Sequence, residues 1–382
     1  MAQPTGYSAF VPAPLPPDPP LDMASLQSSL SRANLALGRL DGVVDIIPDP
    51  DFFVAMYVRR EAVLSSQIEG TQSTLEDLLE VELEPEARRD TSDVGEIVNY
   101  VGAMKHGLGR LGELPLSLRL IRETHAELLG DGRGSHATPG EFRTSQNWIG
   151  PAGAPLAQAT FVPPAPHDMT QALSDFERFL HDEADDRLIA AGLAHAQFET
   201  IHPFVDGNGR VGRLLITLLL VRHGVLRQPL LYLSHHFKRH RAEYYDRLMA
   251  VRLRGDWEGW MRFFLDGVTT TAEEAKLTAD RIFALREEHR TLVIEHSGPN
   301  GLMLLSALFR QPLVNVKTVA RATGVAFGTA NRLVARFEEL GLLREVTGQR
   351  RSRLFRYEPY LDLFDDPEGA VDSSADAEIT AR

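Results

Sequence analysis

Cysteine is absent from this chain of 382 residues, so neither a disulfide framework nor a thiolate zinc site can form. That absence fits a reducing compartment. The N-terminus also lacks the basic flank and apolar core of a signal peptide. The longest apolar run, Leu214–Val221, is far too short to cross a bilayer. Together these absences predict a soluble cytoplasmic protein with no membrane partner.

Basic residues are fewer than acidic ones, 40 against 53, and the resulting net charge of −13 argues against indiscriminate coating of nucleic acid. The length allows two or three domains with a sizeable core. Residues 1–20 contain seven prolines and predict an extended segment, for which a flexible tail is favoured over a segment laid along the body. The acidic residues 366–382 predict a disordered tail.

The most informative stretch is HPFVDGNGRVGR, His202–Arg213. Apolar residues at helical spacing precede it, and an apolar helical pattern follows, so we expect a loop between two helices. Gly207, Asn208 and Gly209 suit backbone conformations that other residues avoid. They immediately precede a helix N-terminus, whose free N–H groups favour an anion. The pattern therefore predicts a phosphate site.

Chemically useful side chains surround that site. His202 could accept a proton, and Asp206 could hold Mg²⁺ through a hard oxygen. Arg210 and Arg213 suit phosphate oxygens. Each group has a role in nucleotidyl transfer. The alternative is a tight turn between helices with a buried histidine and a surface aspartate.

The stretch resembles the signature of the Fic (filamentation induced by cAMP) family, HPFx[DE]GNGRxxR, and matches it at every fixed position. The resemblance implies a protein adenylyltransferase, which moves AMP from ATP to a hydroxyl side chain of a target protein or of itself. It also implies that His202 is the catalytic residue and that Asp206 is the metal ligand. The other signature positions that it assigns to nucleotide binding are Phe204, Gly207, Asn208, Gly209, Arg210 and Arg213.

A second motif lies at the end of the helix predicted for residues 51–69. Gly70 supplies the stop of this helix, so SSQIEG forms its last turn. Glu69 then lies where the helix dipole disfavours negative charge, and it would gain from an arginine brought in from elsewhere.

The six residues Ser65–Gly70 resemble the [ST]xxxE[GN] inhibitory motif of some Fic proteins, with Ser65, Glu69 and Gly70 at its fixed positions. In that class the glutamate pairs with the second signature arginine, here Arg213, and occupies the space of the ATP γ-phosphate. A solvated glutamate at a helix end is the alternative.

Residues 139–163 break the helical pattern, because PGEFRTSQNWIG and a Gly/Pro/Ala-rich loop precede the extended run ATFVPPAP. We expect a β-hairpin, with Phe142 and Trp148 as core anchors. The hairpin resembles the Fic flap, whose edge holds a target segment as an added strand. This resemblance places the target protein near Trp148 to Pro163. A hairpin that only caps the core is the alternative.

The stretch LYLSHHFKRHRAEYYDRL follows the signature helix, and its histidines match no zinc spacing. In Fic relatives it lines the base and ribose, often with asparagine where this chain has His240. Tyr244 or Tyr245 could stack on the base instead. Gln197, on the preceding helix, touches nucleotide in relatives, whereas a helix-surface glutamine is the alternative reading.

Near the C-terminus, TVARATGV and GTANRLVARFEELGLL show a helix-turn-helix pattern, and LLREVTGQRRSRLFRY is typical of a wing. Residues 317–356 contain nine Lys or Arg and three Glu, a local charge of +6. This charge suits phosphate contacts, so DNA is a possible partner. Winged helices also dock proteins, and the sequence does not decide between the two.

The predicted fold is mainly α: a Fic helical core with a small β-hairpin flap, and a C-terminal winged-helix domain. Two rival functions remain open, a Fic-fold enzyme that removes AMP and a transcriptional regulator with a nucleotide-sensing core. A homodimer is also left open. The expected divisions are the proline-rich segment 1–20, a helical region with the inhibitory helix at 21–110, the catalytic core at 111–270, a linker helix and winged helix at 271–365, and the tail at 366–382.

Overall fold

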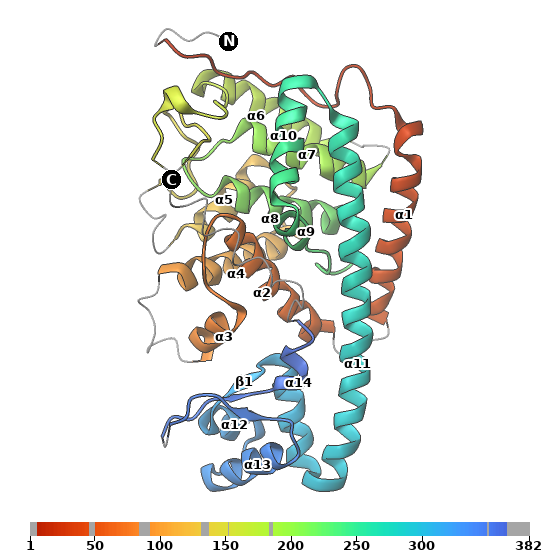
Figure 1. Cartoon of the computed structure of the whole chain (residues 1–382), viewed down its shortest axis with the longest axis vertical. Coiled ribbons are helices and arrows are strands. Elements are labelled where there is room, and N and C mark those ends of the chain that lie inside the picture. The colour runs from red at the N-terminus through yellow and green to blue at the C-terminus, as the bar shows by residue number, and fades with distance from the viewer. Residues whose placement is uncertain are drawn as a thin grey trace. The chain divides into compact units, whose positions relative to one another are not determined.

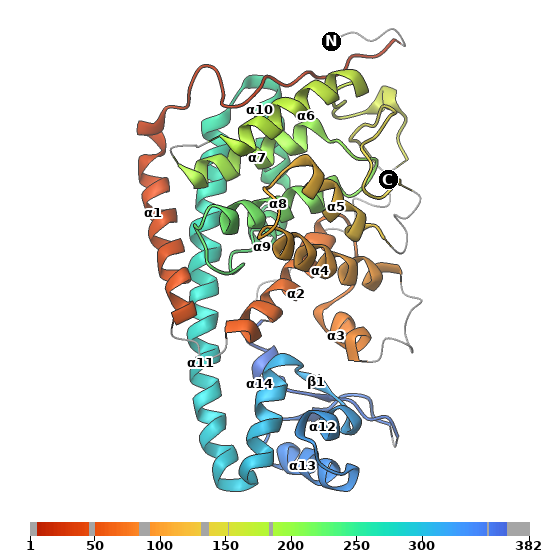
Figure 2. The same cartoon turned by 180° about the vertical axis from the view of Figure 1, so that it is seen from behind.

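The computed structural model describes residues 6–45, 50–83, 92–130, 137–151, 153–182, 186–349 and 351–364. Its fold is mainly α with one small antiparallel sheet of three strands, which confirms the predicted fold class. The chain divides into two compact units, Met1–Lys276 and Leu277–Arg382 (Figures 1 and 2). No helix in the described part of the chain has the length and apolar character needed to span a membrane. The predicted acidic tail lies outside the described residues.

The first unit is built from helices. Their bounds are α1 Met23–Asp41, α2 Pro50–Ile68, α3 Leu75–Leu83, α4 Ser92–Arg110, α5 Leu118–Leu128, α6 Pro166–His181, α7 Arg187–Ile201, α8 Asn208–Arg222, α9 Ser234–Arg239 and α10 Arg241–Arg254. The long helix α11, Trp257–Arg310, begins in this unit and bends at Gly298, which has φ 59° and precedes Pro299. The charged helix predicted near 271–290 is part of α11.

Helices α7 and α8 form the interior of the first unit (Figure 2). Every residue of α7 from Leu188 to Ile201 is buried, because neighbouring helices cover all of its faces. The two helices approach closely at Gly212, where a Cβ would lie 2.6 Å from a Glu199 carboxylate oxygen. His195 joins them, since its Nδ1 lies 2.9 Å from the Gly212 carbonyl and its Nε2 lies 2.9 Å from the Tyr244 hydroxyl. The connecting loop therefore has rigid ends.

Helix α1 packs beside the first part of α11, as Figures 1 and 2 both show. Arg32 pairs with Asp266 at 2.9 Å across this contact. The Asp22 side chain caps α1 and accepts from the Ser25 N–H, while the Asp22 N–H donates to Glu258. Helix α2 packs on α4 and α9, so the helix that leads into the Ser65–Gly70 motif is held against the core.

The second unit holds the end of α11, the helices α12 Val316–Thr323, α13 Phe327–Glu339 and α14 Glu358–Leu361, and the strands β1 Leu313–Val314, β2 Arg344–Glu345 and β3 Phe355–Arg356. Strand β3 lies between β1 and β2, with Phe355 opposite both Val314 and Glu345. Asn315 and Thr318 form a capping box at the start of α12. Val334 and Phe337 of α13 and Phe355 of β3 are buried in this unit. The predicted helix-turn-helix corresponds in sequence to α12 and α13 and the predicted wing to β2 and β3, while the winged-helix assignment stays a prediction.

Candidate functional site

The signature loop begins with His202, which ends α7 in a left-handed conformation with φ 50° and ψ 61°. Such a conformation is unfavourable for a residue with a side chain, so it needs support from its surroundings. The His202 carbonyl accepts hydrogen bonds from Arg143 Nε at 3.0 Å and from Asn147 Nδ2 at 3.3 Å. These two donors fix the backbone from which the imidazole projects.

The middle of the loop is pinned by Asn208 and Phe204. The Asn208 side chain accepts from the Phe204 N–H at 2.8 Å and donates to the Phe204 carbonyl at 2.9 Å. Phe204 is fully buried, and its ring stacks on His125 with centroids 3.7 Å apart. Both predicted nucleotide-binding side chains are therefore engaged within the loop, and we expect them to act by fixing its shape.

His125 also holds the acidic residue of the loop. The Gly140 N–H donates to His125 Nδ1 at 2.9 Å, so Nε2 carries the hydrogen and donates to the Asp206 carbonyl at 3.0 Å. Burial lowers the pKa of His125 to about 4, so the imidazole is neutral at pH 7.

The predicted phosphate site is at the start of α8. Gly207 has φ 77°, a conformation that favours glycine, and it turns the chain into the helix. A Cβ at Gly209 would overlap the Glu69 carboxylate and would lie 3.1 Å from Arg213 Nη1. Glu69 therefore lies against the first turn of α8, where free N–H groups attract negative charge. In this state the carboxylate occupies the place that the sequence assigns to a phosphate.

Arg213 connects this carboxylate to the end of α2. Its Nη2 donates to Glu69 Oε1 at 2.6 Å and to the Ser65 carbonyl at 2.9 Å, and its Nε donates to Ser65 Oγ at 2.9 Å. The guanidinium is almost fully buried, with a side-chain exposure of 1%. Gly70 follows with φ 100° and turns the chain away from the helix. The contact that the sequence predicted is present, while its inhibitory effect stays a prediction.

Two opposing effects act on the Glu69 carboxylate. Burial raises its pKa. The charge and the hydrogen bond of Arg213, together with the charge of Arg210, lower the pKa, and this lowering outweighs the effect of burial. The pKa of Glu69 is therefore below its usual value. Glu69 is an anion at pH 7, as an occupant of an anion site must be.

Arg210, the first signature arginine, is paired as well. Its Nη1 lies 3.1 Å from Glu96 Oε2, and its Nη2 lies 3.7 Å from Asp206 Oδ2. Glu96 belongs to α4 and also accepts a bond from Thr71 Oγ1 at 3.4 Å. Both signature arginines thus contact carboxylates. Glu69, the partner of Arg213, belongs to the Ser65–Gly70 motif. Glu96, the partner of Arg210, is bonded to Thr71, the residue that follows this motif.

His202 has the protonation state that a general base requires. Burial, followed by the charges of Arg252 and Arg143, lowers its pKa to about 3. The imidazole is therefore neutral at pH 7 and can accept a proton. Three residues earlier, burial raises the pKa of Glu199 to about 7, so this carboxyl carries a proton in part of the molecules at neutral pH.

The residues fit Mg²⁺ in the way that nucleotide enzymes hold it. The Asp206 side chain is 55% exposed, and its Oδ1 accepts from the Gly207 N–H at 2.6 Å. The described residues contain no cluster of three or more metal-binding side chains. Mg²⁺ is commonly bound through one carboxylate together with phosphates and water, and Asp206 beside the phosphate site offers such a carboxylate.

The structure distinguishes among the residues predicted to bind the base. Tyr244 is buried, its hydroxyl contacts His195, and its ring stacks on Phe237 with centroids 4.5 Å apart. Stacking on the base by Tyr244 or Tyr245 stays a prediction; in this structure both the ring and the hydroxyl of Tyr244 are engaged in the core. Tyr245 is 37% exposed, and His240 is exposed between α9 and α10.

Gln197 is 4% exposed, and its side-chain amide donates to the Ala13 carbonyl at 2.7 Å. It is not the helix-surface residue of the alternative reading. In this state its donor is used by the N-terminal segment and not by a nucleotide.

The flap is smaller than a full hairpin. One antiparallel bridge, Ile149 with Phe161, joins its two sides among the described residues. Trp148 is 40% exposed, so the expectation that it anchors the core is wrong. Its indole N–H donates to the Ala154 carbonyl at 2.9 Å, which holds the ring within the flap loop and leaves part of it exposed to solvent.

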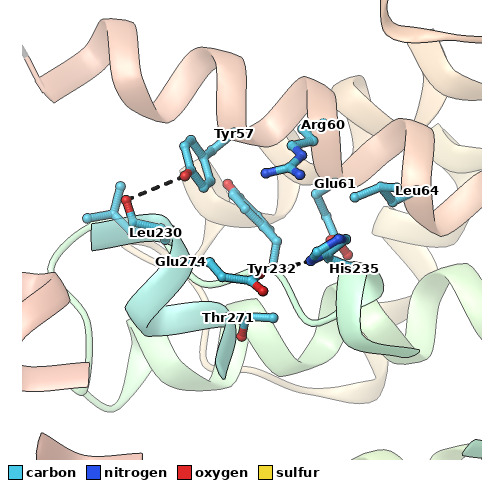
Figure 3. A pocket seen from close by; sticks show the side chains of 10 residues that line it. Tyr57, Arg60, Glu61, Leu64, Leu230, Tyr232, His235, Thr271 and Glu274 are labelled. Carbon is cyan, nitrogen blue, oxygen red and sulfur yellow. Dashed lines mark hydrogen bonds and ion pairs between the residues drawn. The ribbon is translucent and has the colours of Figure 1, made fainter. Parts of the chain in front are cut away.

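A separate small pocket lies between α2, α9 and α11 (Figure 3). His235 and Glu274 pair at 3.0 Å at its wall. None of its lining residues belongs to the signature, so the pocket is not the predicted phosphate site. They are Tyr57, Arg60, Glu61, Leu64, Leu230, Tyr232, His235, Thr271, Glu274 and Ala275.

The sequence argument did not identify four residues that support the site: Glu96, His125, Arg143 and Asn147. Arg143 and Asn147 lie in the stretch recognised as the flap. The polar residues around Arg143 gave no signal that this arginine is buried. Glu96 and His125 lie in ordinary helical patterns that carry no such signal.

Comparison with family models and comparison with individual proteins both give matches to Fic proteins. The Fic/DOC family N-terminal model matches residues 27–109, and the Fic/DOC family model matches residues 115–220. Two relatives named protein adenylyltransferase Fic, from Drosophila grimshawi and Drosophila melanogaster, are 33% and 32% identical over 216 residues. These alignments cover 54% of this chain and 40% and 39% of the relatives, so the chain spans about two fifths of their length.

Solved structures match the fold. A Fic family protein from Desulfovibrio desulfuricans has a TM-score of 0.57 and 18% identity, with 92% of this chain and 98% of that chain covered. A Fic domain containing signaling protein from Bacteroides thetaiotaomicron has a TM-score of 0.51 and 18% identity, with 65% and 95% covered.

The fold and the site define a class of helical protein that presents a histidine and an anion-binding helix start in one loop. A glutamate from a separate helix faces that loop. Residues 27–109 and 115–220 of the chain match the N-terminal region and the Fic domain of the Fic/DOC family.

Proposed function

We propose that this protein is an adenylyltransferase that moves AMP from ATP to a hydroxyl side chain of a protein and is held inactive by Glu69. The observation that carries the proposal is the position of the Glu69 carboxylate against the first turn of α8, bonded to Arg213. A carboxylate there implies an anion site that a ligand would otherwise occupy. The relatives named protein adenylyltransferase Fic support ATP as that ligand.

In the proposed reaction the neutral His202 imidazole takes the proton from the target hydroxyl. The hydroxyl oxygen forms a bond to the α-phosphorus while the bond to the bridging oxygen of pyrophosphate breaks. The N–H groups at the start of α8 hold the phosphates, and Arg210 neutralises charge on the departing pyrophosphate. The products are a protein–AMP ester and pyrophosphate. When bound, Mg²⁺ at Asp206 would stabilise negative charge on the phosphate oxygens.

The experiment that tests this function is incubation of the Glu69→Gly protein with ATP labelled at the α- or the γ-phosphate. AMP transfer should attach the α-label to protein and leave the γ-label in pyrophosphate. Attachment of the γ-label instead would show phosphorylation and would refute the proposal.

Asp206→Asn should remove most of the label incorporation together with its dependence on Mg²⁺, because the amide supplies no negative charge to the cation. We expect a loss of about 100-fold or more in the Glu69→Gly background, since charge stabilisation at a transferring phosphate is a large term. The measurement is incorporation against Mg²⁺ concentration, with Asp266→Asn as a matched control in the exposed ion pair with Arg32. If Asp206→Asn keeps its activity with Mg²⁺, the cation is held elsewhere.

We also propose a second function, DNA binding by the second unit. Helix α13 presents Asn331 and Arg332 on an exposed face, and Arg332 has no ion pair within the described residues. We expect Thr329 to Arg336 to contact the DNA bases and the wing, Arg350 to Arg356, to contact the DNA backbone. The charge available for phosphates is smaller than the sequence count suggests, because ion pairs already hold Arg336, Arg344 and Arg356.

Arg332→Ala should weaken binding to a fluorescent duplex library and lower the salt dependence. If about five phosphates are contacted, the logarithm of affinity should fall steeply with the logarithm of salt, and the variant should lose about one unit of that slope. Arg336→Ala is the matched control on the same helix, since this guanidinium is paired with Glu339 at 2.7 Å and should leave the slope unchanged. If the protein does not bind the duplex library even at low salt, a protein-docking role is favoured instead.

A further inference from the structure

The N-terminal segment is laid along the flap, not free in solution. The Phe10 N–H donates to the Val162 carbonyl at 2.9 Å, and the Phe10 ring lies 5.7 Å from that of Phe161. The Tyr7 hydroxyl donates to Gln146 Oε1 at 3.0 Å. Ala9 is 2% exposed. The expectation of a flexible tail is therefore wrong for residues 6–20; Figure 1 shows the trace beginning beside the flap and crossing above α6 and α10.

Backbone direction identifies which edge of the flap this segment covers. Ile149 and Phe161 exchange hydrogen bonds in both directions, at 2.9 and 3.0 Å. Backbone groups alternate in direction along a strand, so those of Val162 point to the opposite edge. The Phe10 N–H meets Val162 on that edge.

The same alternation leaves the other edge open. The backbone groups of Trp148 and Gly150 point away from Phe161, and within the described part of the chain neither residue has a backbone hydrogen bond. The adjacent residue, Asn147, is bonded to the carbonyls of His202 and Phe204. The open edge therefore continues from the residue that is bonded to the signature loop, and the exposed Trp148 ring flanks it.

We propose that residues Gly6–Pro14 act as an added strand that closes the Val162 edge of the flap and leaves Trp148–Gly150 as the edge for a target. This inference rests on the proposed function: the resemblance implies that an extended target segment pairs with a flap edge, and the N-terminal strand decides which edge remains. Tyr7 and Phe10 are then positioning residues, because they act on the target through the flap. An exposed strand edge is a ready template for such pairing.

Phe10→Pro removes both the N–H that donates to Val162 and the ring beside Phe161, in a segment that is already rich in proline. Hydrogen exchange of the full chain should show the amides of Ile149 and Phe161 exchanging about tenfold faster or more, because at least one supporting hydrogen bond is lost. Val11→Ala is the matched control, since Val11 is 45% exposed. Unchanged exchange in Phe10→Pro would overturn the proposal.

A second experiment measures AMP transfer. The enzyme is the Glu69→Gly protein, and the acceptor is a His202→Ala copy of the chain, which lacks the proposed general base. Phe10→Pro should raise the KM for this acceptor about tenfold and leave kcat within about twofold, because a looser flap costs binding and not chemistry. An unchanged KM, or an equal fall in kcat, would contradict a positioning role. Hydrogen exchange needs no turnover, so it tests the added strand even if the protein does not transfer AMP. The failure of the proposed function can therefore be told apart from the failure of this inference.

A covalent cross-link tests whether the N-terminal segment is an added strand or a competitor of the target. The chain has no cysteine, so Tyr7→Cys and Gln146→Cys can be joined by a short bis-maleimide. In the Glu69→Gly background the joined protein should label the acceptor within about twofold of the unjoined one, as a strand on the opposite edge predicts. A loss of about tenfold or more on joining would mean that the segment blocks the target, and would overturn the proposal.

Discussion

Glu69→Gly should raise incorporation of label from α-labelled ATP about 100-fold over the unsubstituted protein, because a misplaced reacting group costs a rate factor of that order. Glu69 lies against the first turn of α8 and holds Arg213 at 2.6 Å, where a γ-phosphate would compete for the same cation. Its removal frees both the helix start and the guanidinium. The measurement is label incorporated into the protein itself and into an added acceptor at one ATP concentration.

The expected change is in rate more than in affinity. ATP can still bind through its adenosine and inner phosphates while Glu69 remains, but the α-phosphate is then misaligned with the target hydroxyl. ATP affinity measured by calorimetry should therefore change much less than label incorporation. A large gain in affinity with little gain in rate would point to simple occlusion instead.

Three further variants define the switch. Arg213→Ala should not reproduce the activation, because the same arginine is needed to seat the γ-phosphate, and the double variant with Glu69→Gly should be inactive. Ser65→Ala removes the bond to Arg213 Nε at 2.9 Å but keeps the one from Arg213 to the Ser65 carbonyl, and it should activate weakly. Glu113→Gly replaces a glutamate that is 68% exposed and serves as the control. Equal labelling by the unsubstituted protein and Glu69→Gly would return Glu69 to a structural role.

The contact between Glu69 and Arg213 is implied by the family resemblance, because each partner lies in a short contiguous motif that this chain matches. Pro50 and Gly70 mark the two ends of α2, and Gly207 to Gly209 mark the start of α8. Local backbone preferences therefore located the end of α2 and the start of α8, but the pairing of two residues 144 positions apart came from the resemblance.

The partner of Arg210 could not be predicted in this way. Glu96 lies 114 positions earlier in α4, where an acidic residue fits an ordinary amphipathic helix. His125 is similar, since its bond to Asp206 spans 81 positions. Periodicity shows that a residue faces the interior, but not which distant group it meets there. Tertiary packing alone makes these two residues part of the site.

Aromatic residues show the same limit. Trp148 was expected in the core because large apolar side chains are usually buried, yet its indole is 40% exposed on the flap. Tyr244 and Tyr245 are adjacent in sequence, and only the packing of α10 decides that Tyr244 faces His195 while Tyr245 remains 37% exposed. The identity of the base contact therefore depends on a helix rotation that composition does not fix.

His202→Ala in the Glu69→Gly background should lower label incorporation about 10²- to 10⁴-fold, the usual contribution of a positioned general base. ATP binding and the melting temperature should change little. The phosphate site is formed by the start of α8, and the loop is held through the His202 carbonyl, which alanine retains. His223→Ala is the control, because His223 caps the far end of α8, about 22 Å away at 1.5 Å per residue.

The pH dependence separates a base from a residue that only shapes the loop. Burial, with the charges of Arg252 and Arg143, lowers the pKa of His202 to about 3, so the neutral form persists as the pH falls and is lost only near that value. In the Glu69→Gly protein, kcat/KM should therefore show no acidic limb between pH 8 and 6, where an ordinary histidine would begin to take up a proton. A limb near pH 6.5 that disappears in His202→Ala would show an exposed imidazole in the active state. Unchanged labelling by His202→Ala would remove the histidine from the reaction and leave its left-handed backbone as its contribution to the site.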